Sequence, residues 1–184
     1  YTKFYNEVTN NGTISGGVYY GGISGSGTVS GTYHTISFDT NGGSSVPTQW
    51  FVNTDKAPAL QPADPTRENS IFMGWYNGDT KYDFTQSVTS DMTLTAKWVT
   101  TNVSTEAELK EALNAGATSI KLVSDFKLSS TLDLTDKNIT LDLNGYVLTG
   151  DIKLADSSAS PDSILTLIDS NPTATHADSS LPAG

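Results

Sequence analysis

The chain has 184 residues, enough for one domain or for two to three small ones, and its composition changes along its length, which favours several domains. It carries 10 basic and 20 acidic residues, and this formal net charge of -10 argues against nucleic acid or an anionic membrane surface as the main partner. Cysteine is absent, which excludes disulfides and thiolate chemistry, and no apolar run approaches the ~20 residues that a membrane-spanning helix needs.

Residues 1–33 are rich in Gly, Ser, Thr and Tyr and contain an internal repeat. The stretch "NGTISG" at 11–16 returns fifteen residues later as "SGTVSG" at 26–31. Each copy offers one apolar residue, Ile14 or Val29, between hydroxyl side chains and glycines that permit tight turns. This pattern predicts the short rungs of a β-solenoid, and the alternative is a flexible Gly/Ser linker.

Residues 34–99 have the pattern of a compact β domain without a helix. "HTISFDTNGG" alternates Ile36 and Phe38 with polar residues and ends in a turn signal, and "TQWFVN" is a second predicted strand. The three prolines of "KAPALQPADPTREN" exclude an interior strand or a helix there. "SIFMGWYNGDTKYDF" predicts two strands joined through Asn77-Gly78-Asp79, and "DMTLTAKW" predicts a closing strand with alternate apolar residues.

The aromatic side chains of this domain serve either its core or a recognition surface. Strand alternation predicts Phe72 and Tyr76 on one face, and Met73 and Trp75 on the other. A module of this size has few large apolar side chains, so we assign Trp75 to the core together with Phe38, Phe84 and Trp98. Trp50 and Tyr76 are the candidates for a binding surface, because a half-buried aromatic ring can stack on a sugar or on a partner side chain.

Residues 100–184 open with the chain's one strong helix signal. "VSTEAELKEALNAGA" combines a capping box of Thr105 and Glu108, an apolar stripe (Leu109, Ala112 and Leu113) and Gly116 as a C-cap, which predicts a helix near 105–115. Six strand-like pieces follow with polar turns and no second helix between them. Parallel coils of a β-helix, with the helix covering the open end of the stack, explain this order better than βαβ units do.

The sequence indicates no catalytic, cofactor-binding or metal-binding residue. The aspartates of residues 100–184, Asp142 among them, fall mostly between or at the ends of strands, where solvated turn residues are the ordinary finding. His34 and His176 are far apart and lack the partners of a metal or catalytic motif. Asn144, in "LDLNGY", is predicted to be structural: at a solenoid corner its amide can satisfy backbone groups of a neighbouring turn.

Two resemblances add to this reading. "ISFDTNGGSSVP", "PADPTRENSIFMGWYNGDTKYDF" and "VTSDMTLTAKW" resemble, in order, the Listeria-Bacteroides repeat (internalin B-repeat) over residues 34–98. That resemblance implies a small β-grasp-like module, often found in tandem arrays on exported bacterial proteins. The capping helix, "NITLDLNGYVLTG" and "LTLIDSN" are similar to the opening of pectate-lyase-like right-handed β-helices of large bacterial surface proteins.

Together these observations predict a mainly β, non-enzymatic fragment of a bacterial cell-surface or secreted protein, with extracellular location. The chain begins at Tyr1 without a signal-like segment, so we expect a fragment or a processed product. Its expected work is adhesion, presentation or spacing, its expected partners are host or cell-wall glycans or surface proteins, and its edge strands allow self-association. The alternative is the N-terminal support region of a carbohydrate-active β-helix protein.

Overall fold

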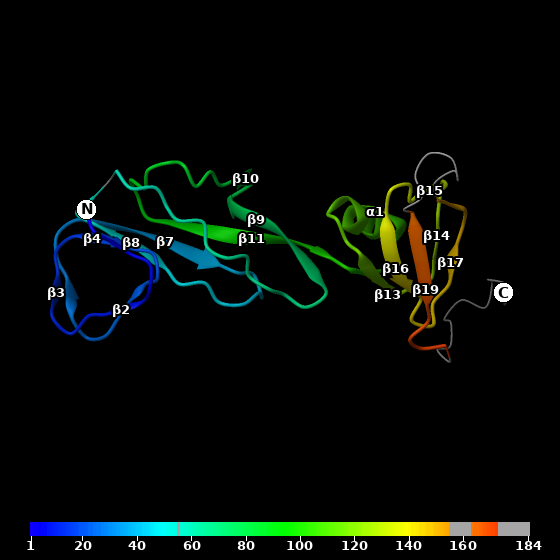
Figure 1. Cartoon of the computed structure of the whole chain (residues 1–184), viewed down its shortest axis with the longest axis horizontal. Helices are drawn as coiled ribbons and strands as arrows, with labels where there is room; N and C mark the ends of the chain where they lie inside the picture. Colours follow the sequence, from blue (N-terminus) through cyan, green and yellow to red (C-terminus); the bar gives the residue numbers. More distant parts are fainter. Residues whose placement is uncertain (55, 155–162, 173–184) are drawn as a thin grey trace. The chain divides into compact units, whose positions relative to one another are not determined.

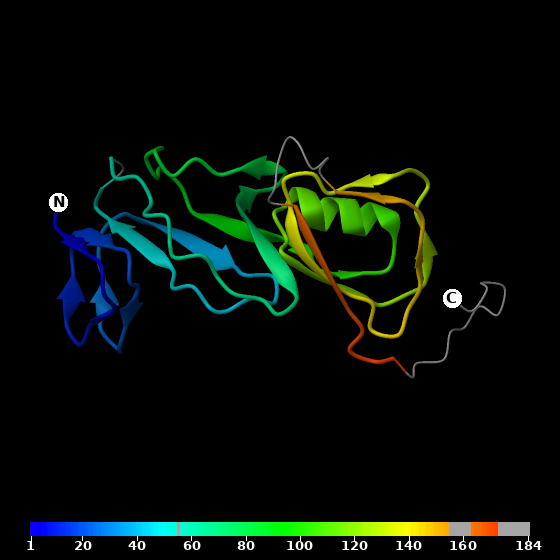
Figure 2. The same cartoon turned by 45° about the vertical axis from the view of Figure 1, so that its right-hand side comes forward.

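The computed structural model describes residues 1–54, 56–154 and 163–172, and the fold of this described part is mainly β, as the sequence predicts (Figures 1 and 2). One α-helix occurs within these ranges. The chain divides into two compact units. The first, here called the N-terminal unit, holds residues 1–68 and 72–98; the second, the C-terminal unit, holds residues 69–71 and those from 99 onward.

The N-terminal unit is built on a seven-stranded mixed sheet. The order across it is β1 (Lys3–Phe4), β4 (Gly17–Tyr19), β8 (Gln49–Val52), β7 (Tyr33–Asp39), β11 (Met92–Thr100), β9 (Ser70–Asn77) and β10 (Thr80–Lys81). Strand β8 pairs antiparallel with both β4 and β7, whereas β7 and β11 are parallel neighbours. The strands expected from "HTISFD", "TQWFVN", "SIFMGWYN" and "DMTLTAKW" are therefore present, and β9 and β10 form the expected hairpin.

The first 33 residues form three parallel strand pairs. These are β1–β4, β2 (Val8–Thr9) with β5 (Ile23–Ser24), and β3 (Thr13–Ile14) with β6 (Thr28–Val29). Ile14 lies opposite Val29, at the same separation as the sequence repeat. Because β4 also pairs with β8, residues 1–33 belong to the same sheet and the same compact unit as the module that follows them.

The core of the N-terminal unit gathers the aromatic residues assigned to it. Trp75 is only 2% exposed, and Phe38, Phe72, Phe84 and Trp98 pack around its cluster. The ring centroid of Phe38 lies 4.8 Å from that of Trp75, in an edge-to-face arrangement. Trp75 is thus a core residue.

The predicted alternation along β9 is wrong. The ring of Phe72 lies 5.4 Å from Trp75, so both residues face the same core although three positions separate them. Gly74 lies between them with a φ of 120°, a conformation outside the strand region, and such a residue shifts the side-chain phase as a β-bulge does. Gly74 is visible in the sequence, but the prediction assumed that side chains alternate regularly between the two faces of the strand, and a glycine with positive φ interrupts that alternation.

The C-terminal unit consists of parallel strands stacked layer upon layer. Its main sheet has the order β12 (Asn102–Val103), β13 (Ser119–Leu122), β16 (Asn138–Asp142) and β19 (Ile164–Ile168). Two shorter ladders pair β14 (Phe126–Lys127) with β17 (Leu148–Thr149), and β15 (Leu132–Asp133) with β18 (Ile152–Lys153). Inward residues stack on one another from layer to layer: Ile120 lies beside Leu141, and Leu141 beside Leu167.

Helix α1 (Glu106–Asn114) begins at the predicted N-cap, and its C-cap lies one residue before the predicted Gly116. Thr105 is the N-cap and accepts a hydrogen bond from the backbone N–H of Glu108. The Glu108 carboxylate accepts from the backbone N–H and hydroxyl of Ser104, one residue earlier than in a standard capping box. At the other end Ala115 is the C-cap and Gly116 follows with a φ of 88°, and the predicted apolar stripe is buried.

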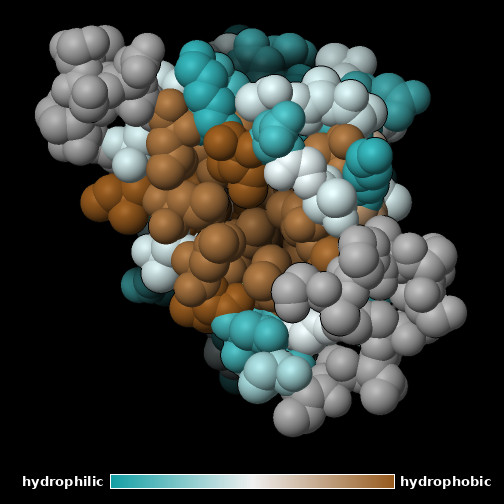
Figure 3. All heavy atoms as spheres, turned by 90° about the vertical axis from the view of Figure 1, so that its right-hand side faces the viewer, coloured by the Kyte–Doolittle hydropathy of each residue, from teal (hydrophilic) through white to brown (hydrophobic). Residues whose placement is uncertain are grey.

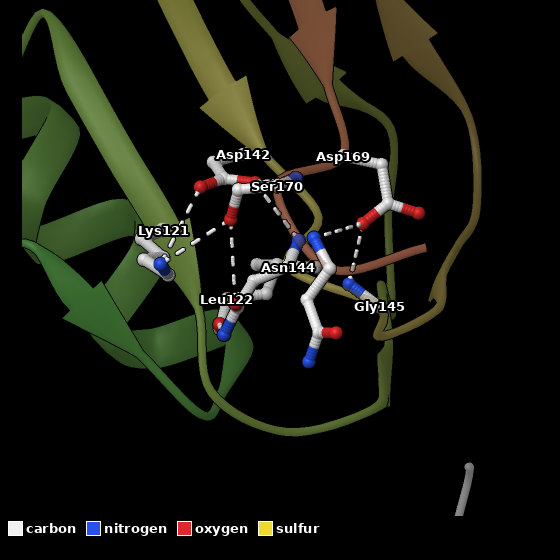
Figure 4. Close-up of polar contacts among 8 residues, drawn as sticks. Lys121, Leu122, Asp142, Asn144, Gly145, Asp169 and Ser170 are labelled. Carbon is white, nitrogen blue, oxygen red and sulfur yellow. Dashed lines mark hydrogen bonds and ion pairs between the residues drawn. The ribbon is translucent and has the colours of Figure 1, made fainter. Parts of the chain in front are cut away.

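A polar corner connects three layers of the C-terminal unit after β13, β16 and β19 (Figure 4). The Asn144 side-chain amide donates to the carbonyl of Leu122 at 3.0 Å, as expected for a corner asparagine, and both Asn144 and Gly145 have positive φ. An Asp142 carboxylate oxygen accepts from the backbone N–H groups of Asn144 and Ser170, each at 2.9 Å. Asp142 is only 9% exposed, so its assignment as a solvated turn residue is wrong.

The hydrogen bonds at this corner determine the charge state of Asp142. Burial acts to raise the pKa of its carboxyl, but the hydrogen bonds from Ser170 and Asn144 and the Lys121 ammonium at 3.6 Å outweigh it, so the pKa is lowered. An ionised carboxylate in this place holds the backbone of two layers together, which explains why an acidic side chain is buried there.

Candidate functional site

Strand β8 is an interior strand of the N-terminal unit's sheet and places Trp50 between Tyr19 of β4 and Thr35 of β7. Adjacent strand residues point to opposite faces, and Phe51 is fully buried while Trp50 remains half-buried. The ring of Tyr33 lies 5.2 Å from that of Trp50 at an angle of 39°. The neighbouring aromatic ring restricts the orientation of Trp50 and leaves part of its surface accessible.

Trp50 lines a groove of about 440 Å³. The groove is formed by Trp50, by Glu7 and Gly21–Ile23 of the N-terminal strand pairs, and by residues 45–48 of the loop between β7 and β8. Two of these loop residues, Ser45 and Thr48, carry hydroxyls, and Glu7 contributes an exposed carboxylate. The groove therefore combines one aromatic surface with donors and acceptors on its rim, which is the usual composition of a small-ligand site.

The glycines of the groove are required by the stacking of the N-terminal strands. A Cβ on Gly21 would lie 2.2 Å from the backbone of Asn6, so no other residue fits that position without moving the chain. Gly22 has a φ of 90° and faces Pro47 and Thr48. These two residues keep the wall of the groove free of side chains opposite the loop.

Tyr76, the second candidate, lies in a different environment. The Lys97 ammonium is 4.4 Å from the centre of its ring, and the same ammonium is 3.4 Å from a carboxylate oxygen of Asp79. Two strands, β7 and β11, separate the strands of Trp50 and Tyr76, which corresponds to about 14 Å at ordinary strand spacing. The structure does not bring Trp50 and Tyr76 into one site.

A second, smaller cavity of about 180 Å³ lies at the β9–β10 side of the sheet. Asp64, Lys81 and Tyr82 line it together with Trp75 and its neighbours Phe72, Met73 and Gly74. Burial raises the pKa of Tyr82, and the adjacent Asp83 carboxylate acts in the same direction, so its hydroxyl stays protonated. The cavity is an irregularity next to the aromatic core, and its aromatic walls are largely core side chains.

The sequence did not indicate Glu7, Ser45 or Thr48 as neighbours of Trp50. Ser45 and Thr48 lie in the loop directly before β8, whereas Glu7 comes near Trp50 only because β4 pairs antiparallel with β8, and no local pattern encodes a pairing between residues so far apart. His34 lines another surface cavity with Thr32, Asn53 and Thr54, whereas His176 lies outside the described residues. Within residues 1–54, 56–154 and 163–172, no group of three or more His, Asp or Glu side chains is placed to hold a metal ion.

Among the described residues, no helix is long and apolar enough to cross a membrane.

Comparison with known proteins supports the assignment of the module that carries Trp50. Two proteins of Evansella cellulosilytica, named "Putative Gly-rich membrane protein" and "Putative membrane protein", are 39% and 37% identical to the chain over 70 residues. Each alignment covers 35% of this chain but only 8% and 10% of the relatives, so the chain spans a small part of their length. No solved structure matches the chain significantly. The family model of the Listeria-Bacteroides repeat domain matches residues 34–97, which confirms the resemblance for that part of the chain.

Proposed function

We propose that this chain is a non-enzymatic part of a bacterial cell-surface protein, serving adhesion or spacing, and that it binds a glycan in the groove beside Trp50. The groove carries the proposal, since it joins a partly accessible tryptophan, two hydroxyls and one carboxylate in a volume of about 440 Å³. Sugars present apolar C–H faces and rings of hydroxyls, so an aromatic surface flanked by hydrogen-bonding groups is complementary to them.

The location at the cell surface is supported by the family and by the relatives. Residues 34–97 match the Listeria-Bacteroides repeat domain, and both similar proteins carry names that describe them as membrane proteins. The finer fold belongs to the same proposal: the repeat module would be β-grasp-like, and the stacked parallel strands of the C-terminal unit would be the start of a β-helix. Stacked and tandem β modules form stiff spacers, which suits presentation of a binding groove.

A glycan array with the whole chain tests the proposal. Trp50→Ala removes the stacking surface and is expected to weaken binding of any retained glycan at least ten-fold, which corresponds to about 1.4 kcal/mol. Tyr76→Ala is the matched control, because it deletes an aromatic ring of the same sheet that lies outside the groove. Full binding by Trp50→Ala, or the absence of any retained glycan, would contradict the glycan site.

A second candidate is the N-terminal support region of a carbohydrate-active β-helix protein. The parallel layers of the C-terminal unit favour it, because polysaccharide-cleaving β-helices are stacks of this kind. The two candidates differ in activity toward a glycan that the chain retains. Incubation with that glycan is expected to release no new reducing ends, and release that Trp50→Ala lowers would favour the enzyme.

A further inference from the structure

Two parts of the described surface differ from the rest in composition. Figure 3 shows an apolar surface at one end of the C-terminal unit, and the exposed aliphatic residues of this unit include Leu154, Ile164, Leu167 and Ile168. Aliphatic side chains carry no charge and no hydrogen-bonding group, so they do not indicate the chemistry of a ligand. The groove beside Trp50 does indicate it, because its lining combines a charge, two hydroxyls and an aromatic ring.

Few side chains determine the chemistry of the Trp50 groove. All of its lining residues other than Glu7, Ser45, Thr48 and Trp50 are glycines or apolar residues. The hydroxyls of Ser45 and Thr48 are neutral and can both donate and accept hydrogen bonds, so they do not distinguish a charged ligand from a neutral one. The charge preference of the groove therefore depends on Glu7 and Trp50.

Both Glu7 and Trp50 favour a positively charged group. Among the described residues that line the groove, the Glu7 carboxylate is the one charged side chain, and no lysine or arginine accompanies it. The face of an indole ring attracts cations through its electrostatic quadrupole. An ammonium group in the groove therefore meets a carboxylate and an aromatic face, whereas a carboxylate of a ligand meets a like charge.

The charge of the whole chain acts in the same direction. Its formal net charge of -10 attracts cationic ligands and repels anionic ones during approach. This long-range attraction acts over the whole surface and does not by itself select a site. The groove adds the selection, because a cation there also contacts the Trp50 ring.

We propose that the Trp50 groove selects a glycan that carries free amino groups, that is, a hexosamine whose nitrogen is not acetylated. This inference rests on the proposed glycan site and names the class of sugar that the site takes. The protonated amine is attracted by the Glu7 carboxylate and by the Trp50 ring, while the sugar hydroxyls bond to those of Ser45 and Thr48. Acetylation of the nitrogen removes the positive charge, and with it both attractions.

A series of four oligosaccharides of equal length and linkage tests the proposal. The cello-oligosaccharide is neutral, its glucosamine analogue carries ammonium groups, its N-acetylglucosamine analogue carries neutral amides, and its glucuronic acid analogue carries carboxylates. In calorimetric titrations of the whole chain, we expect the glucosamine member to bind at least ten-fold more tightly than the glucose member, which corresponds to about 1.4 kcal/mol. The acidic member is expected to bind most weakly, and added salt is expected to reduce these differences.

Glu7→Gln removes the charge and keeps the size of the side chain. It is expected to lower the affinity for the glucosamine member to that for the glucose member. Glu111→Gln is the matched control, because it removes the same charge at an exposed position of α1 in the C-terminal unit and is expected to keep the preference. Equal affinities for the two members in the unaltered chain, or a preference that persists in Glu7→Gln, would overturn the amine selection and leave the glycan site standing.

The glycan array separates a failure of this inference from a failure of the proposed function. If no member of the series binds while the array retains another glycan through Trp50, the amine selection alone is overturned. If neither the series nor the array gives binding, the glycan site is contradicted together with it. Ethanolamine has an amine but no sugar ring and is expected not to displace the glucosamine member; complete displacement at equal concentration would overturn the assignment to a sugar.

Discussion

At the scale of single residues, Gly74 determines how the aromatic side chains of β9 are distributed. Its left-handed backbone brings Phe72 and Trp75 to the same core and leaves Tyr76 under the Lys97 ammonium. A residue with a Cβ is strained at a φ of 120°, and that Cβ would also lie 2.7 Å from Lys81. The identity of one glycine thus decides which rings are core and which face outward.

Gly74→Ala is expected to destabilise the N-terminal unit by about 1–3 kcal/mol, the usual cost of such a backbone conformation for a residue with a side chain. Gly12→Ala is the control, because its Cβ meets no atom within 4 Å and its backbone is not left-handed. Chemical denaturation followed by tryptophan fluorescence measures both variants. Equal stability of the two variants would contradict the role of Gly74, because β9 would then tolerate a residue with a side chain at this position.

At the scale of elements, the corner after β16 joins three layers through Asn144, Asp142 and Ser170. The Asn144 amide satisfies a carbonyl of the layer below, while its own positive φ turns the chain into the next strand. Asparagine adopts this conformation more readily than other residues with a side chain. The corner therefore uses one residue both as a turn and as a contact between layers.

Asn144→Ala is expected to lower the stability of the C-terminal unit by about 1–3 kcal/mol, because it leaves the Leu122 carbonyl without its donor and strains the turn. Hydrogen exchange at the amides of Ile120 and Leu141 reports on this unit separately from the other. Asn138→Ala, at an exposed position of the same strand β16, is the control. Identical protection in the two variants would contradict the corner's role.

Short-range signals explain which elements the sequence predicts well. The ends of α1 depend on residues within one turn of them, and the β9–β10 hairpin depends on Asn77-Gly78-Asp79. The phase of β9 and the burial of Asp142 depend on a backbone torsion and on strands distant in sequence. The Trp50 groove has the same origin, since Glu7 reaches Trp50 only through the pairing of β4 with β8.

At the scale of the whole molecule, most of the described carboxyl groups whose pKa is lowered lie in the C-terminal unit: Asp83 lies in the N-terminal unit, whereas Glu106, Glu108, Asp133 and Asp142 lie in the C-terminal unit. Hydrogen bonds from the hydroxyl and backbone N–H of Thr135, together with the Lys153 ammonium, lower the pKa of Asp133 to about 2. The pKa of Asp142 is lowered as well. A carboxyl whose pKa is lowered in the folded state stabilises the fold at pH values above its unfolded pKa, which is near 3.9. That contribution disappears as the pH falls through its folded pKa.

The C-terminal unit is accordingly expected to lose stability as the pH falls from about 4 to about 2. An NMR titration of the Asp133 carboxyl measures the pKa directly. Thr135→Val removes the hydroxyl that contributes most and is expected to move that pKa upward, while Ser129→Ala, which leaves Asp133 untouched, keeps it unchanged. An Asp133 pKa near 3.9 in the unaltered chain would contradict the hydrogen bonding at this turn.

The parallel pairing of β7 and β11 has a mechanical consequence. These strands begin and end the repeat module, and they are direct neighbours running in the same direction. A force that pulls the start of β7 away from the end of β11 slides the two strands along each other, so it loads all the hydrogen bonds between them at once. A hairpin pulled at its ends opens its bonds one after another, so we expect the module to resist a pulling force at its ends better than a hairpin does.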